Sequence, residues 1–571
     1  MTKVPVACGR ASASSAEPPA TIPVVIVGGG PAGLFSAYLL GRQNIPSIII
    51  TRYQTRLGQP KAHAINPRTL EIFRQAGLDV GALRELSAPL KDAFWVRFNL
   101  GLADHELGKL PYERQDEAAS DVTPEPLFNI SQPIMEEFLQ EAALSTGSVT
   151  IHASWNWLRL EFVAGKPVSI LQSRSEPLKV IRIKSEYIIG ADGTESTVRA
   201  AMANVKWASP DDIERPKRFY CSIHASGDLT RSYRGRDRRG QLSFCFHPNH
   251  RAGLIIYHPV HSWVHARVID PTQEPKDSFT EARCKELIQP CVGPDVDIKI
   301  HSVNMWYTWA RVATDYSDTT HRIHLVGDAA HSFPPQGGLG INTGIADVHN
   351  LIWKLGALLR SKADSIKPLL ATYTQDRRPV AIANSVQSAH NEDIWAKFNM
   401  RVNSAVTKVL ENGSSFDEPT LKQHFDQELA LNKQHFDSLA LQIGYVYDPA
   451  LDPTQMRTDC GNYQPSSTVG ARVPHAWLQD GRSTLDLVPD NGFVIFHSGS
   501  SYVDSIYEFG SIEIPMKVVD MSSVGAPESW LSIMGLGSDK AVVVRPDQHV
   551  LGHVTRGEDA QALVARYLQG Q

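Results

Sequence analysis

The sequence predicts an α/β protein in which a discontinuous, doubly wound parallel sheet carries an inserted, mostly antiparallel sheet and precedes a separate small α/β domain. Two observations lead to this prediction. A short apolar run, a glycine turn and a helical pattern follow one another at residues 24–40, and an apolar run followed by a helical pattern returns at residue 323. Between these segments, residues 217–308 contain alternating runs, which are typical of antiparallel strands.

The composition is that of a globular protein with a large core. The chain has 571 residues, of which 42% are hydrophobic and 20% are charged, and this length suggests about three or four domains. The formal net charge of −5 shows no basic excess, which argues against a nucleic-acid partner. The six cysteines are scattered without a C-x-x-C pair, so we expect a reduced, cytoplasmic protein without a metal site.

The N-terminus carries neither a secretion signal nor a membrane span by its pattern. Residues 1–20 are rich in Ala, Ser and Pro and lack an apolar segment, which predicts a disordered tail, with an organelle transit peptide as the alternative. Residues 21–41 are uncharged and long enough to cross a bilayer. However, Gly28-Gly29-Gly30-Pro31 would break a spanning helix near its middle, so we predict no membrane span.

The elements of the first half follow from local signals. Apolar runs at 24–27 and 47–50 indicate buried parallel strands, and the helix between them, 31–40, has Pro31 in its first turn. A second helix is predicted over 66–77, with Asn66 as its cap and Gly77 at its end. Residues 132–144 are predicted to be helical, and residues 149–189 to contain strands.

The second half begins with the inserted sheet, whose predicted strands are 219–225, 241–247, 253–258 and 262–269. A strand at 323–327 then leads to a long helix from about residue 342, and residues 380–445 are helical and polar. Residues 450–470 have the composition of a linker. Strands at 493–496, 516–519 and 541–545 and a helix at 559–569 form the last domain.

The first chemical motif is a G-x-G-x-x-G sequence formed by Gly28, Gly30 and Gly33, between a strand and a helix. Glycines there let a backbone approach a pyrophosphate, and the helix N-terminus offers N–H groups to it. The alternative is a glycine turn that only packs the helix on the strand. An acid is expected about 20 residues further on to hold a ribose. Here Thr51 and Arg52 stand instead: Thr51 can bond a ribose hydroxyl, and Arg52 suggests a 2′-phosphate and hence NADP as an alternative.

Two further motifs also follow strands. Asp192 lies in a Gly-Ala-Asp-Gly turn, which is weak evidence by itself because such turns are common. Asp328 begins the more specific one: Gly-Asp-Ala-Ala-His is followed by a Pro/Gly-rich loop, residues 334–340, and then by a helix. Its carboxylate suits sugar hydroxyls. The apolar face of that helix is expected to anchor it in the core, and its N-terminus would stabilise negative charge on a bound group such as a reduced flavin ring.

Together the three motifs resemble the single-component, FAD-dependent aromatic hydroxylases, the class A flavoprotein monooxygenases. More narrowly, the chain is similar to the phenol hydroxylase and dichlorophenol monooxygenase branch, with which residues 61–71, 129–132 and 377–379 also agree. The resemblance covers about residues 21–571. It implies a Rossmann-like FAD-binding domain and, from residues 470–475 and 544–547, a thioredoxin-like C-terminal domain. The latter lacks C-x-x-C, so a thiol redox role is not expected.

The resemblance divides the chain into domains. It implies a tail, 1–20; an FAD-binding domain in three parts, 21–90, 131–200 and 309–400; a substrate domain in two parts, 91–130 and 201–308; a helical region and linker, 401–464; and the thioredoxin-like domain, 465–571.

The resemblance also assigns site residues. Gly28, Gly30 and Gly33 would hold the FAD pyrophosphate, Asp328 the ribityl or pyrophosphate part, and Gln132 the flavin region. Asp192 belongs to a motif that serves both FAD and the reduced nicotinamide. The isoalloxazine would be lined by Pro335, Gly338, Gly340 and Asn342. Thr51 replaces the glutamate usual in the family, so binding of the adenosine ribose is the departure from its pattern.

The implied reaction consumes NAD(P)H and O2 and hydroxylates a small phenolic or polyketide-like aromatic substrate through a flavin C4a-hydroperoxide. A phenolate reacts better than a phenol, so a proton acceptor is expected at the flavin face. His63 lies where phenol hydroxylases carry an acid, and we predict that it accepts this proton near neutral pH; the alternative is a buried, hydrogen-bonded histidine. His331 is expected to be structural. Tyr220 and Tyr257 lie on the inserted strands, but alternation does not tell which face meets the flavin.

Other outcomes stay open. The same scaffold supports Baeyer–Villiger oxidation or epoxidation, and the loss of the acid at Thr51 admits an inactive flavin-binding scaffold. The resemblance also leaves a homodimer open, because this branch often dimerises.

Overall fold

The computed structural model describes residues 17–54, 58, 60–116, 119–248, 250–361, 368–417, 419–455, 459–499, 505–509, 512–537, 539–555 and 560–570. Most of the expected tail, together with Cys8, therefore lies outside the described residues. The five other cysteines are buried. No helix within the described ranges is both long and apolar enough to cross a membrane.

The first sheet is parallel where the motifs lie. Its parallel strands are, in spatial order, β7 (Val149–Ala153), β2 (Ser47–Thr51), β1 (Thr21–Val27) and β10 (Val180–Gly190). The second half of β10 also pairs in parallel with β18 (Ile323–Leu325). Its first half pairs antiparallel with β9 (Lys166–Ser173), which leads to β8 (Trp155–Val163). Segments far apart in sequence thus form one sheet, which confirms the predicted discontinuous α/β fold.

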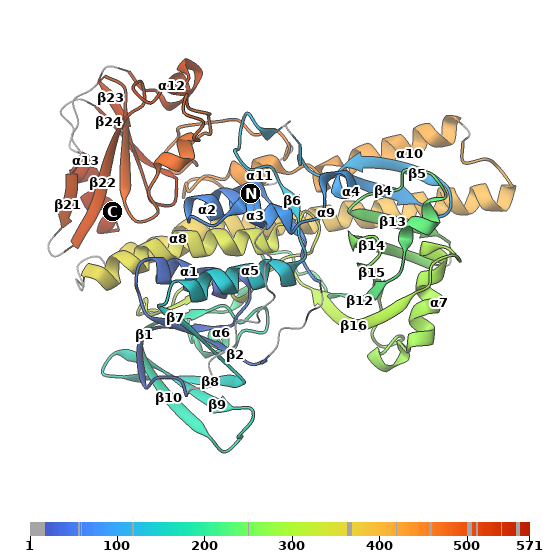
Figure 1. The fold of residues 1–571 in the computed structure, drawn as a ribbon, viewed down its shortest axis with the longest axis horizontal. Helices are drawn as coiled ribbons and strands as arrows, with labels where there is room; N and C mark the ends of the chain where they lie inside the picture. Colours follow the sequence, from blue (N-terminus) through green and yellow to red (C-terminus); the bar gives the residue numbers. More distant parts are fainter. Residues whose placement is uncertain are drawn as a thin grey trace, which may run out of the picture.

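Helices pack against this sheet (Figure 1). α1 (Pro31–Arg42) packs between α5 (Gln132–Ser145) and α8 (Gly340–Ser361). The predicted apolar face of α8 lies in the core, since Ile345, Val348, Ile352 and Leu355 are fully buried. α2 (Pro67–Gln75) is capped as predicted, because the Asn66 side chain accepts a hydrogen bond from the Thr69 N–H.

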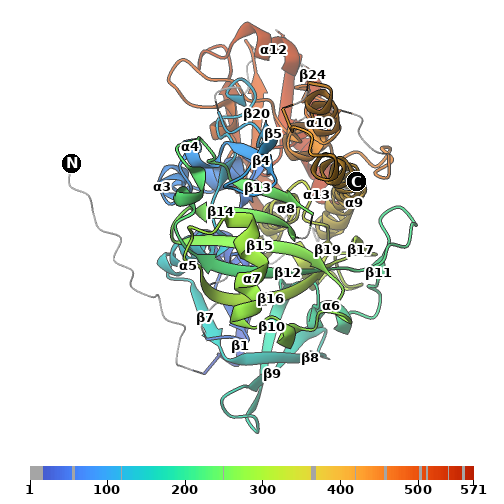
Figure 2. The same cartoon turned by 90° about the vertical axis from the view of Figure 1, so that its right-hand side faces the viewer.

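The second sheet is the inserted one. Its order is β16 (Lys299–Thr308), β12 (Arg218–Ser226), β15 (Ser262–Ile269), β14 (His250–His258), β13 (Leu242–His247), β4 (Trp95–Asn99) and β5 (Glu106–Pro111). Every pair is antiparallel except β13 with β4, so the prediction of a mostly antiparallel sheet is confirmed. α7 (Glu281–Val292) covers one face, whereas α9 (Ala371–Asn412) and α10 (Pro419–Leu431) pack against the other (Figures 1 and 2).

Two expected domain boundaries fall inside helices. The boundary at residue 400 lies within α9, which runs unbroken for 42 residues, and the one at residue 200 lies within α6 (Thr197–Ala201). Neither point carries a composition change, and Pro379 does not end α9.

The shorter elements are α3 (Val80–Glu85), α4 (Leu90–Ala93), α11 (Leu439–Ile443), β3 (Ala64–Ile65), β6 (Phe128–Asn129), β11 (Trp207–Ala208), β17 (Arg311–Ala313) and β19 (His331–Ser332).

The C-terminal unit is a five-stranded mixed sheet with two helices. Its order is β21 (Ser505–Phe509), β22 (Ile512–Asp520), β20 (Phe493–His497), β23 (Lys540–Val544) and β24 (Val550–Thr555), with α12 (Glu528–Met534) and α13 (Ala560–Leu568). β20 and β22 are parallel, and the other pairs are antiparallel. Three of these strands were predicted from the sequence; β21 and β24 were not.

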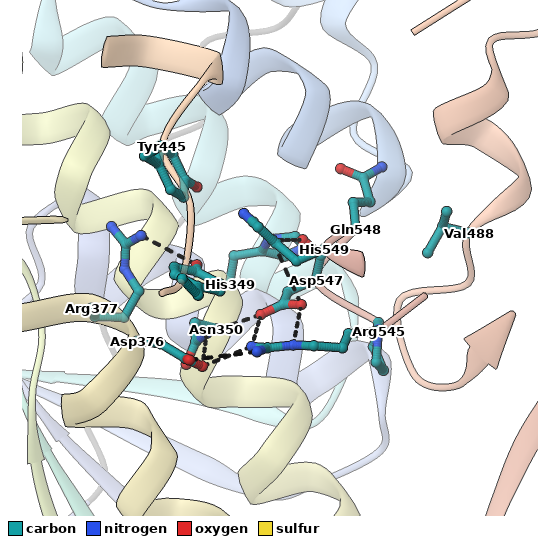
Figure 3. Close-up of polar contacts among 12 residues, drawn as sticks. His349, Asn350, Asp376, Arg377, Tyr445, Val488, Arg545, Asp547, Gln548 and His549 are labelled. Atoms are coloured by element: carbon teal, nitrogen blue, oxygen red, sulfur yellow. Dashed lines mark hydrogen bonds and ion pairs between the residues drawn. The ribbon is translucent and has the colours of Figure 1, made fainter. Parts of the chain in front are cut away.

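A buried polar cluster, which we call the docking network, joins the C-terminal unit to α8 and α9 (Figure 3). It consists of Asn350, Lys354, Asp376, Arg545 and Asp547. Arg545 binds both acids, at 2.8 Å to Asp376 and 2.6 Å to Asp547. Lys354 contacts Asp376 at 3.0 Å, and Asn350 donates to both acids at 2.9 Å. Burial lowers the pKa of Lys354 to about 8, whereas Arg545 and Lys354 overcome burial and hold the pKa of Asp376 at about 2.

Candidate active site

The predicted site residues meet at one edge of the first sheet. Gly28 follows β1, Thr51 ends β2, Asp192 follows β10 and Asp328 follows β18. These four strands are parallel, so all four residues lie at the carboxyl edge, where ligands bind in open α/β sheets. The Gly28 N–H donates to the Ile50 carbonyl, and the Ala191 N–H donates to the Val27 carbonyl, which holds adjacent loops together.

The glycines of the first motif have three different surroundings. Gly28 has φ +108°, and a β-carbon there would lie 2.2 Å from the Ala191 carbonyl oxygen. A β-carbon at Gly33 would lie 2.0 Å from the Gly28 carbonyl oxygen, so this residue lets α1 approach the turn. At Gly30, the N-cap of α1, no atom of the described residues beyond its chain neighbours lies within 4 Å of that position. The crowded glycines shape the turn, and the open one leaves room for a ligand beside the helix N-terminus.

Thr51 and Arg52 lie at the neighbouring strand end. Thr51 is half-buried, whereas Arg52 is exposed and its guanidinium carbon lies 5.8 Å from the centre of the Tyr53 ring. This placement is compatible with either predicted role, a ribose contact by Thr51 or a phosphate contact by Arg52.

The Asp192 carboxylate is used within its own loop. It accepts hydrogen bonds from Ser196 Oγ, from the Thr197 N–H and Oγ1, and from the Val198 N–H, and it thereby caps α6. Sequence reasoning missed this capping role. The role of Asp192 toward FAD and nicotinamide stays a prediction. In that role Asp192 would act indirectly, by fixing the shape of its loop.

Asp328 lies in the turn that follows β18. Its side chain is exposed, yet the surrounding protein desolvates the carboxyl and raises its pKa, an effect that His331 and Lys61 oppose. Arg199 ties this turn to the preceding loop: its guanidinium donates to the Ala329 and Thr194 carbonyls, both at 2.8 Å. A carboxylate held in this way, with no protein hydrogen bond of its own among the described residues, can accept from ligand hydroxyls.

Buried side chains also fix the turn that carries Asp328. His331 is fully buried with its Nε2 2.8 Å from Asp347, and Arg377 binds the same carboxylate at 2.9 Å. The Gly327 N–H donates to Asp347 as well. His331 is therefore structural, as expected. The contribution of Asp347 was not predicted, because its neighbours in sequence look like an ordinary apolar helix face.

The loop before α8 is built from glycines in the left-handed region. Gly337 has φ +102° and Gly338 has φ +63°, and the Gly338 N–H donates to the Pro335 carbonyl. Gly340 then begins α8. Pro335 is exposed. The first N–H groups of α8 have no partner within the helix, so the loop presents a positive helix end.

Asn342 has a structural role that its predicted place at the isoalloxazine did not include. Its side chain is 5% exposed and makes four hydrogen bonds. The amide nitrogen donates to the Ala64 and Gly338 carbonyls, and the oxygen accepts from the Asn66 N–H and Thr69 Oγ1. Asn342 thus fixes the glycine loop against the segment that carries His63.

His63 lies beside this loop, one residue before β3. A β-carbon built on Gly338 would lie 3.3 Å from the β-carbon of Ala64, which shows how closely the two segments approach. The His63 Nδ1 is 2.9 Å from Asn129 Oδ1, and the Tyr257 hydroxyl donates to the Lys61 carbonyl at 3.3 Å. Gln132 pairs with Ala62 through its backbone N–H and accepts the Ala62 N–H on Oε1.

The pKa of His63 differs from the expectation. Desolvation lowers it to about 4, and the hydrogen bond to Asn129 offsets only part of this shift. The imidazole is therefore neutral at pH 7 and does not titrate near neutrality. Sequence reasoning could not anticipate this, because the segments that bury the ring lie far from it along the chain.

The inserted sheet turns one face toward this region. On β12, Cys221 and Ile223 pack with α7, whereas Tyr220 faces α9 and donates to Glu392 at 3.0 Å. On the same side, the Phe244 and Trp395 rings lie 4.4 Å apart. Glu392 is a further residue that the sequence did not reveal, because it lies on α9, 172 residues from its partner.

Two buried polar atoms beside the glycine loop lack partners. Gln336 Oε1 and Asn391 Nδ2 have no hydrogen bond among the described residues, and a β-carbon on Gly337 would lie 3.3 Å from Asn391 Nδ2. Buried polar atoms normally have partners, so both atoms are available to a polar ligand bound at this loop. With the open space at Gly30, the Asp328 carboxylate and two helix N-termini, the site fits a flavin dinucleotide. Within the described residues, no group of three or more His, Cys, Asp or Glu could hold a metal.

Residues 21–388 match the model of a family described as an FAD binding domain. The chain belongs to this family. It is similar to the tetracenomycin B2 monooxygenase-dioxygenase of Streptomyces olivaceus, with 27% identity over 95% of this chain and 97% of that protein. The phenol 2-monooxygenase of Pseudomonas sp. (strain EST1001) is also 27% identical, over 95% of this chain and 90% of that one.

Among solved structures, the fold resembles the flavin-dependent monooxygenase PieE, solved with FAD and substrate. The TM-score is 0.82 at 24% identity, and the match covers 97% of this chain and 100% of that one. The family resemblance predicted from the motifs is confirmed by these comparisons, and so is FAD as the cofactor.

Proposed function

We propose that this FAD-dependent protein is a monooxygenase that consumes NAD(P)H and inserts one atom of O2 into a phenolic or polyketide-like aromatic compound. The observation that carries the proposal is the placement of the FAD loops beside His63 and the aromatic face of the inserted sheet. The relatives that act on a phenol and on tetracenomycin B2 by name support this substrate class.

The chain's own residues divide the work. Gly28, Gly30 and Gly33 would admit the pyrophosphate, and Asp328 would accept hydroxyl hydrogen bonds. The loop of Pro335, Gly338 and Gly340 would border the isoalloxazine, and the α8 N-terminus would favour negative charge on it. When bound, FAD supplies the redox chemistry with NAD(P)H and O2. His63 and Tyr220 lie on the side where an aromatic substrate would bind.

Several finer assignments accompany this proposal. The C-terminal unit is thioredoxin-like in the order β22-β20-β23-β24, with β21 in place of the first helix. The division into FAD-binding and substrate domains follows the two large sheets. A homodimer and a cytoplasmic location are retained from the resemblance and from the scattered cysteines.

The visible spectrum of the purified protein, repeated with NADPH and a panel of phenols, tests the function. Flavin bands that one phenol causes to bleach faster, with a product heavier by one oxygen and no ring expansion, support aromatic hydroxylation. Ring expansion or an epoxide would assign Baeyer–Villiger oxidation or epoxidation instead. Absence of flavin after soaking with FAD would favour an inactive scaffold.

Replacement of Asp328 by alanine is expected to weaken FAD binding about 10- to 100-fold, because a hydrogen bond to a charged group contributes about 1.5–3 kcal/mol. The measurement is a fluorescence titration of the deflavinated protein with FAD. Asp295→Ala, which removes an exposed carboxylate paired with Arg234, is the control and should bind FAD normally. A fully loaded, yellow Asp328→Ala protein would contradict the assignment.

Replacement of His63 by alanine is expected to leave FAD bound and to slow hydroxylation about tenfold, the value of one hydrogen bond of about 1–1.5 kcal/mol. A pKa of about 4 means that the neutral ring is present at pH 8 and remains so down to about pH 5. The His63-dependent part of the rate should therefore be constant over this range and fall only as pH approaches 4. An unchanged rate in the variant at every pH would remove His63 from the site.

A further inference from the structure

The hydrogen bond of His63 belongs to a longer chain of buried amides. Asn129 Oδ1 lies 2.9 Å from His63 Nδ1, and Asn129 Nδ2 donates to Gln115 Oε1 at 3.0 Å. Gln115 Nε2 then donates to two backbone carbonyls, those of Ala93 at 3.0 Å and Tyr112 at 2.8 Å. Both amide side chains are buried, Asn129 at 1% and Gln115 at 5% exposure.

The orientation of the amide groups in this series of hydrogen bonds is fixed by Gln115. Backbone carbonyls only accept hydrogen bonds, so the Gln115 atom that faces two of them must be the NH2 group. Its oxygen then faces Asn129, which must present its own NH2 group there. The Asn129 oxygen is left for His63, and an oxygen can pair only with a protonated Nδ1. The neutral ring consequently carries its proton on Nδ1 and a free lone pair on Nε2.

The backbone holds the same residues in place. β3 and β6 pair antiparallel with Ala64 opposite Asn129, and the Ile130 N–H donates to the His63 carbonyl. The Tyr112 ring lies 5.6 Å from the imidazole, so the residue whose carbonyl ends the chain also packs against His63. No partner for Nε2 is found in the part of the protein that the structure describes.

We propose that Asn129 and Gln115 are positioning residues that hold His63 as its Nδ1–H tautomer and so present Nε2 as the acceptor for the hydroxyl proton of an aromatic substrate. The substrate part of this inference rests on the proposed function, whereas the tautomer does not. Desolvation keeps the ring neutral, so that Nε2 retains a lone pair, but it also lowers the basicity of the ring; the tautomer is set by the hydrogen bonds and not by the pKa.

The test is 15N NMR of the FAD-loaded protein labelled with 15N-histidine, with His63→Gln used to identify the His63 signals. In the wild type we expect a pyrrole-type shift for Nδ1 and a pyridine-type shift for Nε2 from pH 6 to 8. Gln115→Met removes the anchor, so the Asn129 amide can rotate and the Nε2–H tautomer should appear. Asn129→Asp keeps an acceptor at Nδ1 and should retain the original tautomer.

Gln442→Met is the matched control: Gln442 is buried to a similar degree, and its amide contacts Glu113 and Ser438 rather than this chain. It should leave the His63 signals unchanged. Hydroxylation per NAD(P)H consumed should fall in Gln115→Met at unchanged FAD affinity. A wild-type Nε2–H tautomer, or a Gln115→Met spectrum identical to wild type, would overturn the proposal. The expected tautomers without hydroxylation of any phenol would instead refute the proposed function alone.

Discussion

FAD binding is expected to be lost when Gly33 is replaced by alanine, together with part of the stability of the first sheet. The added β-carbon would lie 2.0 Å from the Gly28 carbonyl oxygen, which is backbone and cannot swing aside. α1 would have to move away from the glycine turn that precedes it, and such overpacking costs about 1–3 kcal/mol. We expect a lower Tm and a flavin-to-protein absorbance ratio near zero.

Gly30→Ala separates ligand binding from folding. Apart from its neighbours along the chain, no atom of the described residues lies within 4 Å of the position of its β-carbon, so the variant should fold with the wild-type Tm. The new methyl group would nevertheless occupy the space through which a pyrophosphate approaches the N-terminus of α1, and FAD binding should be lost. Gly537→Ala adds a methyl group at another open position, in the C-terminal unit, and should change neither property. Normal FAD affinity in Gly30→Ala would place the pyrophosphate elsewhere.

The contrast between these glycines shows what could be predicted from the sequence. A strand, a glycine turn and a helix are local signals, so the positions of Gly28, Gly33 and Asp328 in turns after strands follow from their immediate neighbours. The apolar spacing of α8 is local in the same sense, and it correctly predicted which face is buried. The strand ends then converge because parallel strands share a carboxyl edge.

The parts that could not be predicted depend on contacts between distant segments. Glu392 meets Tyr220 across 172 residues, and Asn342 meets Asn66 across 276. The pKa of His63 depends on how deeply its ring is buried, which no local pattern encodes. The position of a proton on that ring depends in turn on Gln115, which lies in a stretch of irregular structure without a motif.

The docking network predicts the largest effect on stability. Arg545→Met is expected to destabilise the protein by about 3–5 kcal/mol, because removal of one partner leaves charges buried without compensation. Asp376, whose side chain is 12% exposed, would then keep Lys354 as a partner, whereas the fully buried Asp547 would lose its arginine. The change is measured as a shift in the urea concentration at the unfolding midpoint. Unfolding is followed by tryptophan fluorescence, to which Trp353 and Trp530 contribute together with the other tryptophans.

Two further variants show whether charge is the cause. Asp547→Asn added to Arg545→Met removes the charge of the buried acid that has lost its arginine and should recover part of the lost stability, which a mere packing defect would not allow. Arg482→Met removes an arginine from the same C-terminal unit, but its pair with Asp480 is about half exposed, so the expected cost is below about 1 kcal/mol. Equal losses in Arg545→Met and Arg482→Met would contradict the interpretation. A selective loss means that the C-terminal unit is held on α8 and α9 by buried charge, and because α8 begins at the flavin loop, FAD affinity should fall with it.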